Sequence, residues 1–276
     1  MKIVKNVINI GIEKPFTIIH TSDTHITRTD AKDSIIRKKF ASERCKTFFQ
    51  NSEENLEFIR NYVNKTGHQL VHTGDLIDFI TPKNLKTANA FAKETDMLFI
   101  AGNHEMATCP NNVFCEKDYA EDLKNKESTL DSVQKFFYND IRFFCKEING
   151  VCLVGINNSN YQISLRDLDK LKQVLALNKP IILFTHIPFY SEELCTKEKR
   201  FMLATPEEIV NTLTPWQIFE QKANKETMQA YDYICSQSLI KCFVSGHLHF
   251  DFVSSPENKI NQLVTDINTL REIAIR

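Results

Sequence analysis

Five short motifs containing Asp, Asn and His recur along this chain, and each of them follows an apolar run. In order they are Asp23-Thr24-His25, Gly74-Asp75-Leu76-Ile77-Asp78, Gly102-Asn103-His104-Glu105, His186, and Gly246-His247-Leu248-His249. Short apolar runs that end in polar turns are typical of buried β-strands. The pattern therefore constrains the fold to one in which carboxylate, amide and imidazole groups lie at the ends of strands.

The first elements predicted from residue patterning alternate between strand and helix. Apolar runs predict strands at 16–20, 69–73 and 97–101, and helical periodicity predicts helices within 32–65 and 84–95. Strands in such an order are parallel and joined by right-handed crossovers, so their carboxyl ends meet at one edge of the sheet. We expect six side chains to gather at that edge, namely Asp23, His25, Asp75, Asp78, Asn103 and His104.

The helical pattern over 32–65 predicts one apolar face. Its members are Ile35, Ile36, Phe40, Phe48, Phe49, Leu56, Ile59 and Val63. Gly67 follows the pattern, and we expect it to end the helical stretch because glycine readily takes the left-handed conformation found at helix ends.

The remaining elements continue to the end of the chain. Strands are expected at 3–13, 141–148, 151–156, 180–185 and 241–245, helices at 129–138, 164–177 and 226–239, and a loop at 108–126. Asn149-Gly150 is typical of a hairpin turn. Residues 250–276 alternate in polarity and are expected to form an antiparallel meander. The irregular stretch 188–225 predicts an insertion or lid over the ligand edge of a single domain spanning 1–276.

Composition narrows the class of protein. The chain has 276 residues, of which 42% are hydrophobic and 25% charged, as in a globular protein with one large core. The net charge of −1 argues against a broad basic surface for nucleic acid. No long apolar run predicts a membrane span or a secretory leader, so a cytoplasmic protein is expected. Oligomeric state has no signal in the sequence.

The eight cysteines point to the same compartment. They form no C-x-x-C pair, which argues against a zinc knuckle or a redox dithiol. Cys109 and Cys115 flank a loop and are close enough in sequence to pair. In a chain without an export signal, free thiols are the expected state.

The chemistry of the motifs predicts a site for transition metals. Side chains two residues apart in an extended segment point to the same side, so Asp23 and His25 can meet at one ion. Asp75 offers two oxygens and can bridge two ions, while Asn103 offers a neutral oxygen. Mixed carboxylate, amide and imidazole ligands suit Mn, Fe or Zn better than Ca²⁺. Two such ions about 3.5–4 Å apart activate a bridging water for in-line attack on phosphorus.

Taken together and in this order, the five motifs resemble those of the calcineurin-like metallophosphoesterase superfamily over residues 16–250. The resemblance implies an α/β fold, a two-sheet β-sandwich flanked by helices in four αββα layers. It also implies two divalent or trivalent transition metal ions. One ion would be held by Asp23, His25, Asp75 and His249. The other would be held by Asp75, Asn103, His186 and His247.

The resemblance assigns roles to two further residues. His104 would donate a proton to the leaving oxygen, and Asp78 would orient His104 by a hydrogen bond. An imidazole is a suitable proton donor near neutral pH, and a carboxylate partner fixes its tautomer. The sequence departs from the protein Ser/Thr phosphatases, because Phe79 and Ile80 follow Asp78 where those enzymes carry Arg-Gly. It also lacks the tyrosine that purple acid phosphatases place beside the shared carboxylate.

The expected function is hydrolysis of a small phosphomonoester or phosphodiester, with a nucleotide among the candidate substrates. A nuclease or a nucleotide pyrophosphatase of the same superfamily is the alternative enzyme. A scaffold that kept the fold and lost catalysis, and a purely structural metal site, are the alternatives from other classes. Taken singly, His20 and His72 are expected to be packed and hydrogen-bonded rather than ligands, and Glu105 to support the site from behind.

Overall fold

The computed structural model describes residues 1–107, 128–199, 202–256 and 260–276. The expected loop at 108–126 and the two cysteines that flank it, Cys109 and Cys115, lie outside these residues. Within the described part of the chain, no helix combines the length and apolar character needed to cross a membrane.

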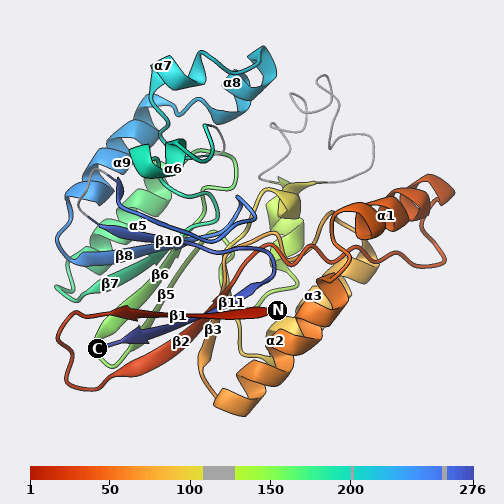
Figure 1. Cartoon of the computed structure of the whole chain (residues 1–276), viewed down its shortest axis with the longest axis horizontal. Helices are drawn as coiled ribbons and strands as arrows, with labels where there is room; N and C mark the ends of the chain where they lie inside the picture. Colours follow the sequence, from red (N-terminus) through yellow and green to blue (C-terminus); the bar gives the residue numbers. More distant parts are fainter. Residues whose placement is uncertain (108–127, 200–201, 257–259) are drawn as a thin grey trace.

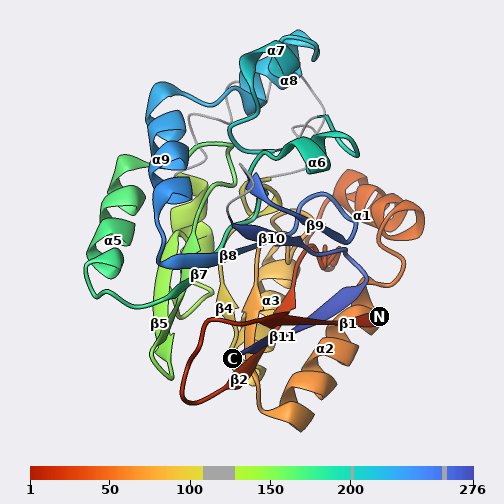
Figure 2. The same cartoon turned by 60° about the vertical axis from the view of Figure 1, so that its left-hand side comes forward.

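Two mixed β-sheets form the centre of the molecule (Figures 1 and 2). The five-stranded sheet contains, in spatial order, β1 (Lys2–Ile8), β11 (Thr269–Ile275), β2 (Phe16–Thr21), β3 (Gln69–His72) and β4 (Leu98–Phe99). The six-stranded sheet contains β5 (Phe143–Ile148), β6 (Val151–Ile156), β7 (Ile181–Phe184), β8 (Ile240–Ser245), β10 (Asn261–Val264) and β9 (Phe252–Ser254). We call these the first and the second sheet.

Helices cover the outer face of each sheet, and apolar side chains fill the spaces between the layers. The first sheet carries α2 (Ser52–Thr66) and α3 (Pro82–Glu94), and the second carries α5 (Leu165–Leu175) and α9 (Lys225–Ser236). Between the sheets lies one buried cluster that includes Ile18, Val71, Ile182, Val244 and Ile273. Two further clusters join each sheet to its helices. Because each fully buried aliphatic side chain contributes about 1.5–3 kcal/mol, these layers hold the sandwich together.

The strand directions agree with the predicted crossovers. β2 pairs with β3 in parallel, and β3 pairs with β4 in parallel. β5 and β6 form the predicted antiparallel hairpin. Its turn residues Asn149 and Gly150 have φ of 49° and 84°, which are the positive values a type I′ turn requires.

The predicted helical stretch over 32–65 is divided into two helices. α1 (Ile35–Thr47) begins after Ser34, whose side chain accepts a hydrogen bond from the Arg37 amide, and α2 ends at Gly67 with φ of 65°. The predicted apolar face is wrong at Ile35, Ile36 and Phe48, which are 85%, 66% and 63% exposed. Figure 1 shows the reason: α1 projects away from both sheets, so its apolar positions have no sheet to pack against.

The carboxyl-terminal meander is the second wrong expectation. β9 and β10 are antiparallel, but β10 pairs with β8 in parallel. After β10 the chain leaves the second sheet. β11 belongs to the first sheet, where it is parallel to β1 and antiparallel to β2. Alternating polarity predicts a strand correctly but contains no information on which neighbour the strand will find.

Short helices occupy the stretch 188–225 that was predicted as an insertion. They are α6 (Glu192–Cys195), α7 (Glu207–Val210) and α8 (Pro215–Gln221). In Figure 1 α7 and α8 lie beyond one end of the second sheet. The role of this stretch as a lid stays a prediction.

Candidate dinuclear metal centre

The five motifs follow the carboxyl ends of five strands. Asp23 comes after β2, Asp75 after β3, Asn103 after β4, His186 after β7 and His247 after β8. The strands of the first sheet that carry motifs are parallel neighbours, and so are β7 and β8 of the second sheet. Both sheets therefore direct their motif loops towards one shared edge of the sandwich.

Several candidate ligands have the left-handed backbone conformation, which side chains other than glycine rarely adopt. They are Asp23, His25, Asp75, His247 and His249, with φ between 50° and 70°. Each such residue costs of order 1–3 kcal/mol, and such strain is tolerated where surrounding contacts enforce it, as at functional sites. The sharp turns aim successive side chains into the space between the loops.

Three glycines precede candidate ligands, and the structure explains them mainly by lack of space. A Cβ on Gly102 would collide with the Asp75 carboxylate, and one on Gly246 would collide with Ser22 and Asp23. A Cβ on Gly74 would collide with the backbone of Gly102, and Gly74 also has φ of 95°. Freedom to take a positive φ therefore matters at Gly74, while Gly102 and Gly246 are needed for close approach.

The first cluster of candidate ligands contains Asp23, His25 and His249. His249 Nε2 lies 3.4 Å from Asp23 Oδ1 and 3.1 Å from His25 Nε2. Asp23 Oδ1 is buried and has no hydrogen-bond partner among the described residues. Three potential ligand atoms thus converge on one small volume from two different loops.

The second cluster contains Asp75, His186 and His247, with Asn103 beside them. His186 Nε2 lies 2.9 Å from Asn103 Oδ1 and 3.0 Å from His247 Nδ1. Asp75 Oδ2 is 3.4 Å from His186 Nε2 and 3.8 Å from His25 Nε2 of the first cluster. The Asp75 carboxylate therefore lies between the two clusters.

The donor atoms in both clusters fit bound cations. His186 Nδ1 lies 2.7 Å from the carbonyl of Thr73 and must donate to it, so Nε2 is the nitrogen that can give a lone pair to a metal once its proton is lost. Imidazole nitrogens that approach to about 3 Å with lone pairs inward repel one another unless a cation or a proton lies between them. Carboxylate, amide and imidazole donors together match Mn, Fe or Zn. The residues present thus suit a pair of transition metal ions.

Electrostatics keep most of these groups in the protonation state that metal ligands need. Burial raises the pKa of Asp75, but nearby His186 and His104 outweigh it and hold that pKa well below the usual range. Burial lowers the pKa of His25 to about 4 and that of His247 to about 3. His186 differs, because the Asp75 carboxylate outweighs burial and raises its pKa to about 9. A metal must therefore displace a proton from His186.

His104 lies beside the clusters with its ring fixed by Asp78. Its Nδ1 is 2.6 Å from the Asp78 carbonyl oxygen and 3.2 Å from Asp78 Oδ1, and its Nε2 is 3.9 Å from Asp75 Oδ2. Both neighbours of Nδ1 are oxygen acceptors, so Nδ1 carries a proton. Burial lowers the pKa of His104, but the Asp75 and Asp78 carboxylates outweigh it and raise the pKa to about 10.

Arg44 is a residue of this site that the sequence reasoning missed. From α1 its guanidinium donates to both Asp78 oxygens, over Nε–Oδ2 and Nη2–Oδ1 distances of 2.8 and 2.6 Å. Asp78 Oδ1 also lies 3.3 Å from His25 Nδ1. The Asp78 carboxylate thus contacts Arg44, the candidate ligand His25 and the candidate proton donor His104. Arg44 is separated from Asp78 by 34 residues, and no local motif marks it.

Glu105 holds two of the motif loops together from behind. Its carboxylate accepts hydrogen bonds from the backbone amides of Asp75, Leu76 and Ile77 on one loop, and of Gly102 on the other. The distances lie between 2.7 and 3.2 Å. This contact fixes the position of Asp75 relative to Asn103, as expected for a supporting residue.

His20 and His72 have hydrogen-bonded partners inside the sandwich. Both His20 ring nitrogens lie 2.9 Å from threonine hydroxyls, those of Thr265 and Thr73. His72 Nε2 lies 2.9 Å from the hydroxyl of Thr24. Their ring nitrogens are engaged in these contacts, as the sequence interpretation expected.

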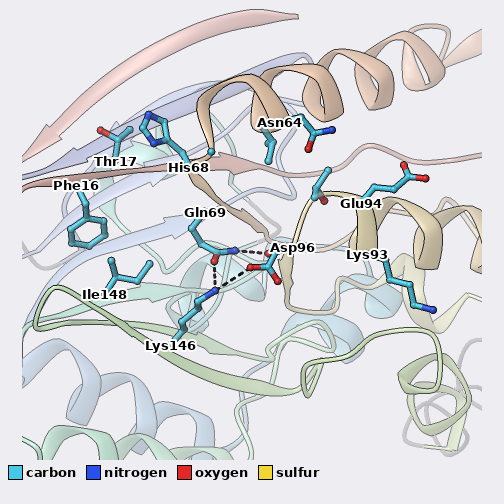
Figure 3. A pocket seen from close by; sticks show the side chains of 13 residues that line it. Phe16, Thr17, Asn64, His68, Gln69, Lys93, Glu94, Asp96, Lys146 and Ile148 are labelled. Carbon is cyan, nitrogen blue, oxygen red and sulfur yellow. Dashed lines mark hydrogen bonds and ion pairs between the residues drawn. The ribbon is translucent and has the colours of Figure 1, made fainter.

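A separate cavity of about 660 Å³ lies at the other end of the first sheet (Figure 3). It is lined by residues at the beginnings of β2 and β3, including Thr17 and His68. Figure 3 shows Gln69, Asp96 and Lys146 joined to one another across it, with Lys146 Nζ 3.3 Å from Asp96 Oδ2. Lys146 and Asp96 are paired with each other, and the cavity lies at the end of the strands opposite to the candidate ligands.

Comparisons with known proteins give one family match and several structural likenesses. A family model described as calcineurin-like phosphoesterase matches residues 16–251. A search of curated proteins finds no match. Among solved structures, a dimetal phosphatase from Danio rerio is 12% identical, with 91% of this chain and 87% of that chain covered and a TM-score of 0.50. At this identity the likeness concerns the fold.

Two further solved structures are similar at lower TM-scores. A phosphopantetheinyl hydrolase from Mycobacterium tuberculosis is 13% identical, with 91% of this chain and 90% of that chain covered and a TM-score of 0.42. A 5'-nucleotidase from Candida albicans is 15% identical, with 91% of this chain and 45% of that chain covered and a TM-score of 0.39. The chain thus spans less than half of that nucleotidase.

Proposed function

This chain belongs to the calcineurin-like phosphoesterase family and is a phosphoric ester hydrolase, and we propose that its substrate is a small phosphomonoester or phosphodiester, with nucleotides as the first class to test. The observation that carries the proposal is the Asp75 carboxylate, placed 3.4 Å from His186 Nε2 and 3.8 Å from His25 Nε2. A single carboxylate between two clusters of candidate ligands is the arrangement that a dinuclear site requires.

The proposed ligand sets follow the two clusters. Asp23, His25, Asp75 and His249 would hold one ion. Asp75, Asn103, His186 and His247 would hold the other. When bound, the ions supply Lewis acidity that activates water and stabilises charge on the phosphoryl oxygens. Mn, Fe and Zn all suit this mixture of nitrogen and oxygen donors.

The proposed role of His104 is to protonate the leaving oxygen. Asp78 keeps a proton on Nδ1, so Nε2 is the ring atom that faces the clusters. The raised pKa of His104, about 10 in the metal-free protein, keeps the imidazole protonated at neutral pH. The side chain is 17% exposed, so it can reach a substrate while its orientation stays fixed.

The test is hydrolysis of phosphate esters by protein stripped with a chelator and reloaded with Mn²⁺, Fe²⁺ or Zn²⁺. A panel of monoesters, diesters and nucleotides distinguishes the substrate classes, and duplex DNA tests the nuclease alternative. Wild type should hydrolyse at least one ester in the presence of at least one of the metals. Absence of metal-dependent hydrolysis across the panel would contradict the proposal.

His104→Ala tests the proton-donor role more sharply when two leaving groups are compared. We expect kcat to fall roughly 10²–10⁴-fold for an alkyl phosphate, whose leaving oxygen needs a proton, and less for a nitrophenyl phosphate, whose leaving oxygen does not. Metal content should stay unchanged. His68→Ala, at the remote cavity, is the matched control and should retain activity. Equal losses for both esters would argue against proton donation.

A further inference from the structure

The loop that follows β6, residues 157–163, contacts three of the motif loops although it carries no motif of its own. Asn158 is fully buried, and its amide exchanges two hydrogen bonds with the backbone of Ile187, beside His186. Ser159 Oγ lies 3.8 Å from Met106 Sδ, at the end of the Gly102–Glu105 motif. Tyr161 reaches the third loop, where its hydroxyl lies 2.9 Å from His247 Nε2.

Building on the function proposed above, we propose that Tyr161 is a positioning residue for metal binding, which fixes the tautomer and the ring orientation of His247. His247 Nδ1 faces the second cluster, 3.0 Å from His186 Nε2. If Nδ1 is to give its lone pair to a metal, the ring proton must be on Nε2. The Tyr161 oxygen is placed to accept that proton in a hydrogen bond.

The backbone of Tyr161 supports a specific role for its side chain. Its φ is 60°, a conformation that bulky side chains rarely adopt, and the residue is only 2% exposed. The Tyr161 amide donates to the Asn158 carbonyl over 2.8 Å, which closes the turn. This turn places the ring edge-on to the His247 ring, with centroids 5.7 Å apart and planes at 79°. The strained residue therefore serves to bring a hydroxyl to one imidazole nitrogen.

A packing role alone is the competing explanation, because Tyr161 also belongs to the apolar cluster between the second sheet and its helices. Tyr161→Phe separates the two roles, since it keeps the ring, its volume and the backbone strain and removes only the hydroxyl. Tyr231→Phe is a matched control. It removes a hydroxyl from another buried tyrosine, whose hydroxyl donates to the Tyr190 carbonyl over 3.3 Å.

The experiment is calorimetric titration of chelator-stripped protein with Mn²⁺ and with Zn²⁺. Wild type should bind two ions. Tyr161→Phe should bind one of them roughly 10–100-fold more weakly, the size of effect typical for loss of a partner to a ligand histidine. Tyr231→Phe should bind both as wild type does. The thermal midpoint of the metal-free Tyr161→Phe protein should stay within the spread of the Tyr231→Phe control.

Nitrogen-15 spectra of the histidine rings give a second readout that packing would not change. In the zinc-loaded wild type, His247 should carry its proton on Nε2. Two ions bound by Tyr161→Phe with wild-type affinities, or a His247 proton on Nδ1, would overturn the inference about Tyr161. Failure of wild type to bind any ion would instead overturn the dinuclear centre itself, so the two failures are distinguishable.

Discussion

At the scale of single residues, the Asp78 carboxylate is the group on which most of the site's geometry converges. It is fully buried and contacts Arg44, His25 and His104. Its hydrogen bonds to Arg44, His104 and His25 outweigh burial and hold its pKa well below the usual range. A buried charge of this kind is tolerated only while its partners are present.

Replacement of Arg44 should therefore destabilise the protein and impair catalysis together. We expect Arg44→Ala to cost about 3 kcal/mol in urea unfolding of the metal-free protein, since it leaves a buried carboxylate with fewer partners. Arg44→Lys should recover part of this loss, because lysine keeps the positive charge but lacks the bidentate hydrogen bonds of the guanidinium to both Asp78 oxygens. Lys39→Ala is the control on the same helix. Its pair with Glu43 is exposed on both sides, and its loss should cost under about 1 kcal/mol.

Residues of the candidate site can be predicted from the sequence only where a local motif marks them. Asp75 and His247 stand in motifs whose spacing and flanking strands mark them, so the sequence was sufficient to propose them. Arg44 and Tyr161 contact Asp78 and His247 across 34 and 86 residues, and neither lies in a motif. Such partners are chosen by tertiary packing, which no local pattern encodes.

At the scale of elements, the motif loops cross so closely that their glycines determine the site. Gly102 and Gly74 are in contact through their backbones, and Gly102 also lies against the Asp75 carboxylate. Gly67, at the end of α2, also has positive φ but nothing lies within 4 Å of where its Cβ would be. A comparison of Gly102 with Gly67 thus separates the effect of crowding from the effect of backbone strain.

Gly102→Ala should remove metal binding, because the added methyl group displaces the shared carboxylate of Asp75. Gly67→Ala should cost only about 1–2 kcal/mol from its left-handed backbone and should leave metal binding unchanged. Metal titration followed by thermal unfolding of both variants checks this. Two ions bound by Gly102→Ala with wild-type affinity would show that the loops can separate without harm.

The elements themselves were predictable to different degrees. Parallel β2, β3 and β4 followed from the alternation of strand and helix, and the β5–β6 hairpin followed from its turn residues. α1 was not placed correctly, because an apolar periodicity predicts a helix but not the surface that it covers. Likewise, the pairing of β11 depends on a partner sheet that is distant in sequence.

At the scale of the whole molecule, the candidate centre joins the two sheets. The first cluster combines Asp23 and His25, which follow the first sheet, with His249, which follows the second. Arg271 of β11 makes a second junction, because it is buried and bonds to Asn6 of β1 and to Asp251, which follows the second sheet's β8. Bound metal should therefore stabilise the sandwich as a whole.

Metal removal should lower the thermal midpoint in a pH-dependent manner. Ions at a thousandfold excess over Kd stabilise by about 4 kcal/mol. In the metal-free protein the raised pKa of His186, about 9, contributes stability that is present below pH 6.5 and is lost as the pH rises through 9. Because that proton competes with the metal, the gap between metal-loaded and metal-free midpoints should widen from pH 6 to pH 9.

Scanning calorimetry with and without a chelator across this pH range measures that gap. His186→Ala is the informative comparison, because it lacks both the ligand and the competing proton. Its gap should be smaller and flatter with pH. A gap that narrows as the pH rises in wild type would contradict the assignment of His186 as a ligand.

The place of β11 has a consequence for how the chain is made. β11 lies between β1 and β2, and it is synthesised after every strand of the second sheet. While the nascent chain is on the ribosome, β1 and β2 have emerged long before the strand that joins them. All strands of the second sheet are made earlier. The first sheet, whose loops bear Asp23 and Asp75, lacks one of its strands until β11 is made. The first sheet, with the motif loops that it carries, can therefore be completed only after β11 has been made.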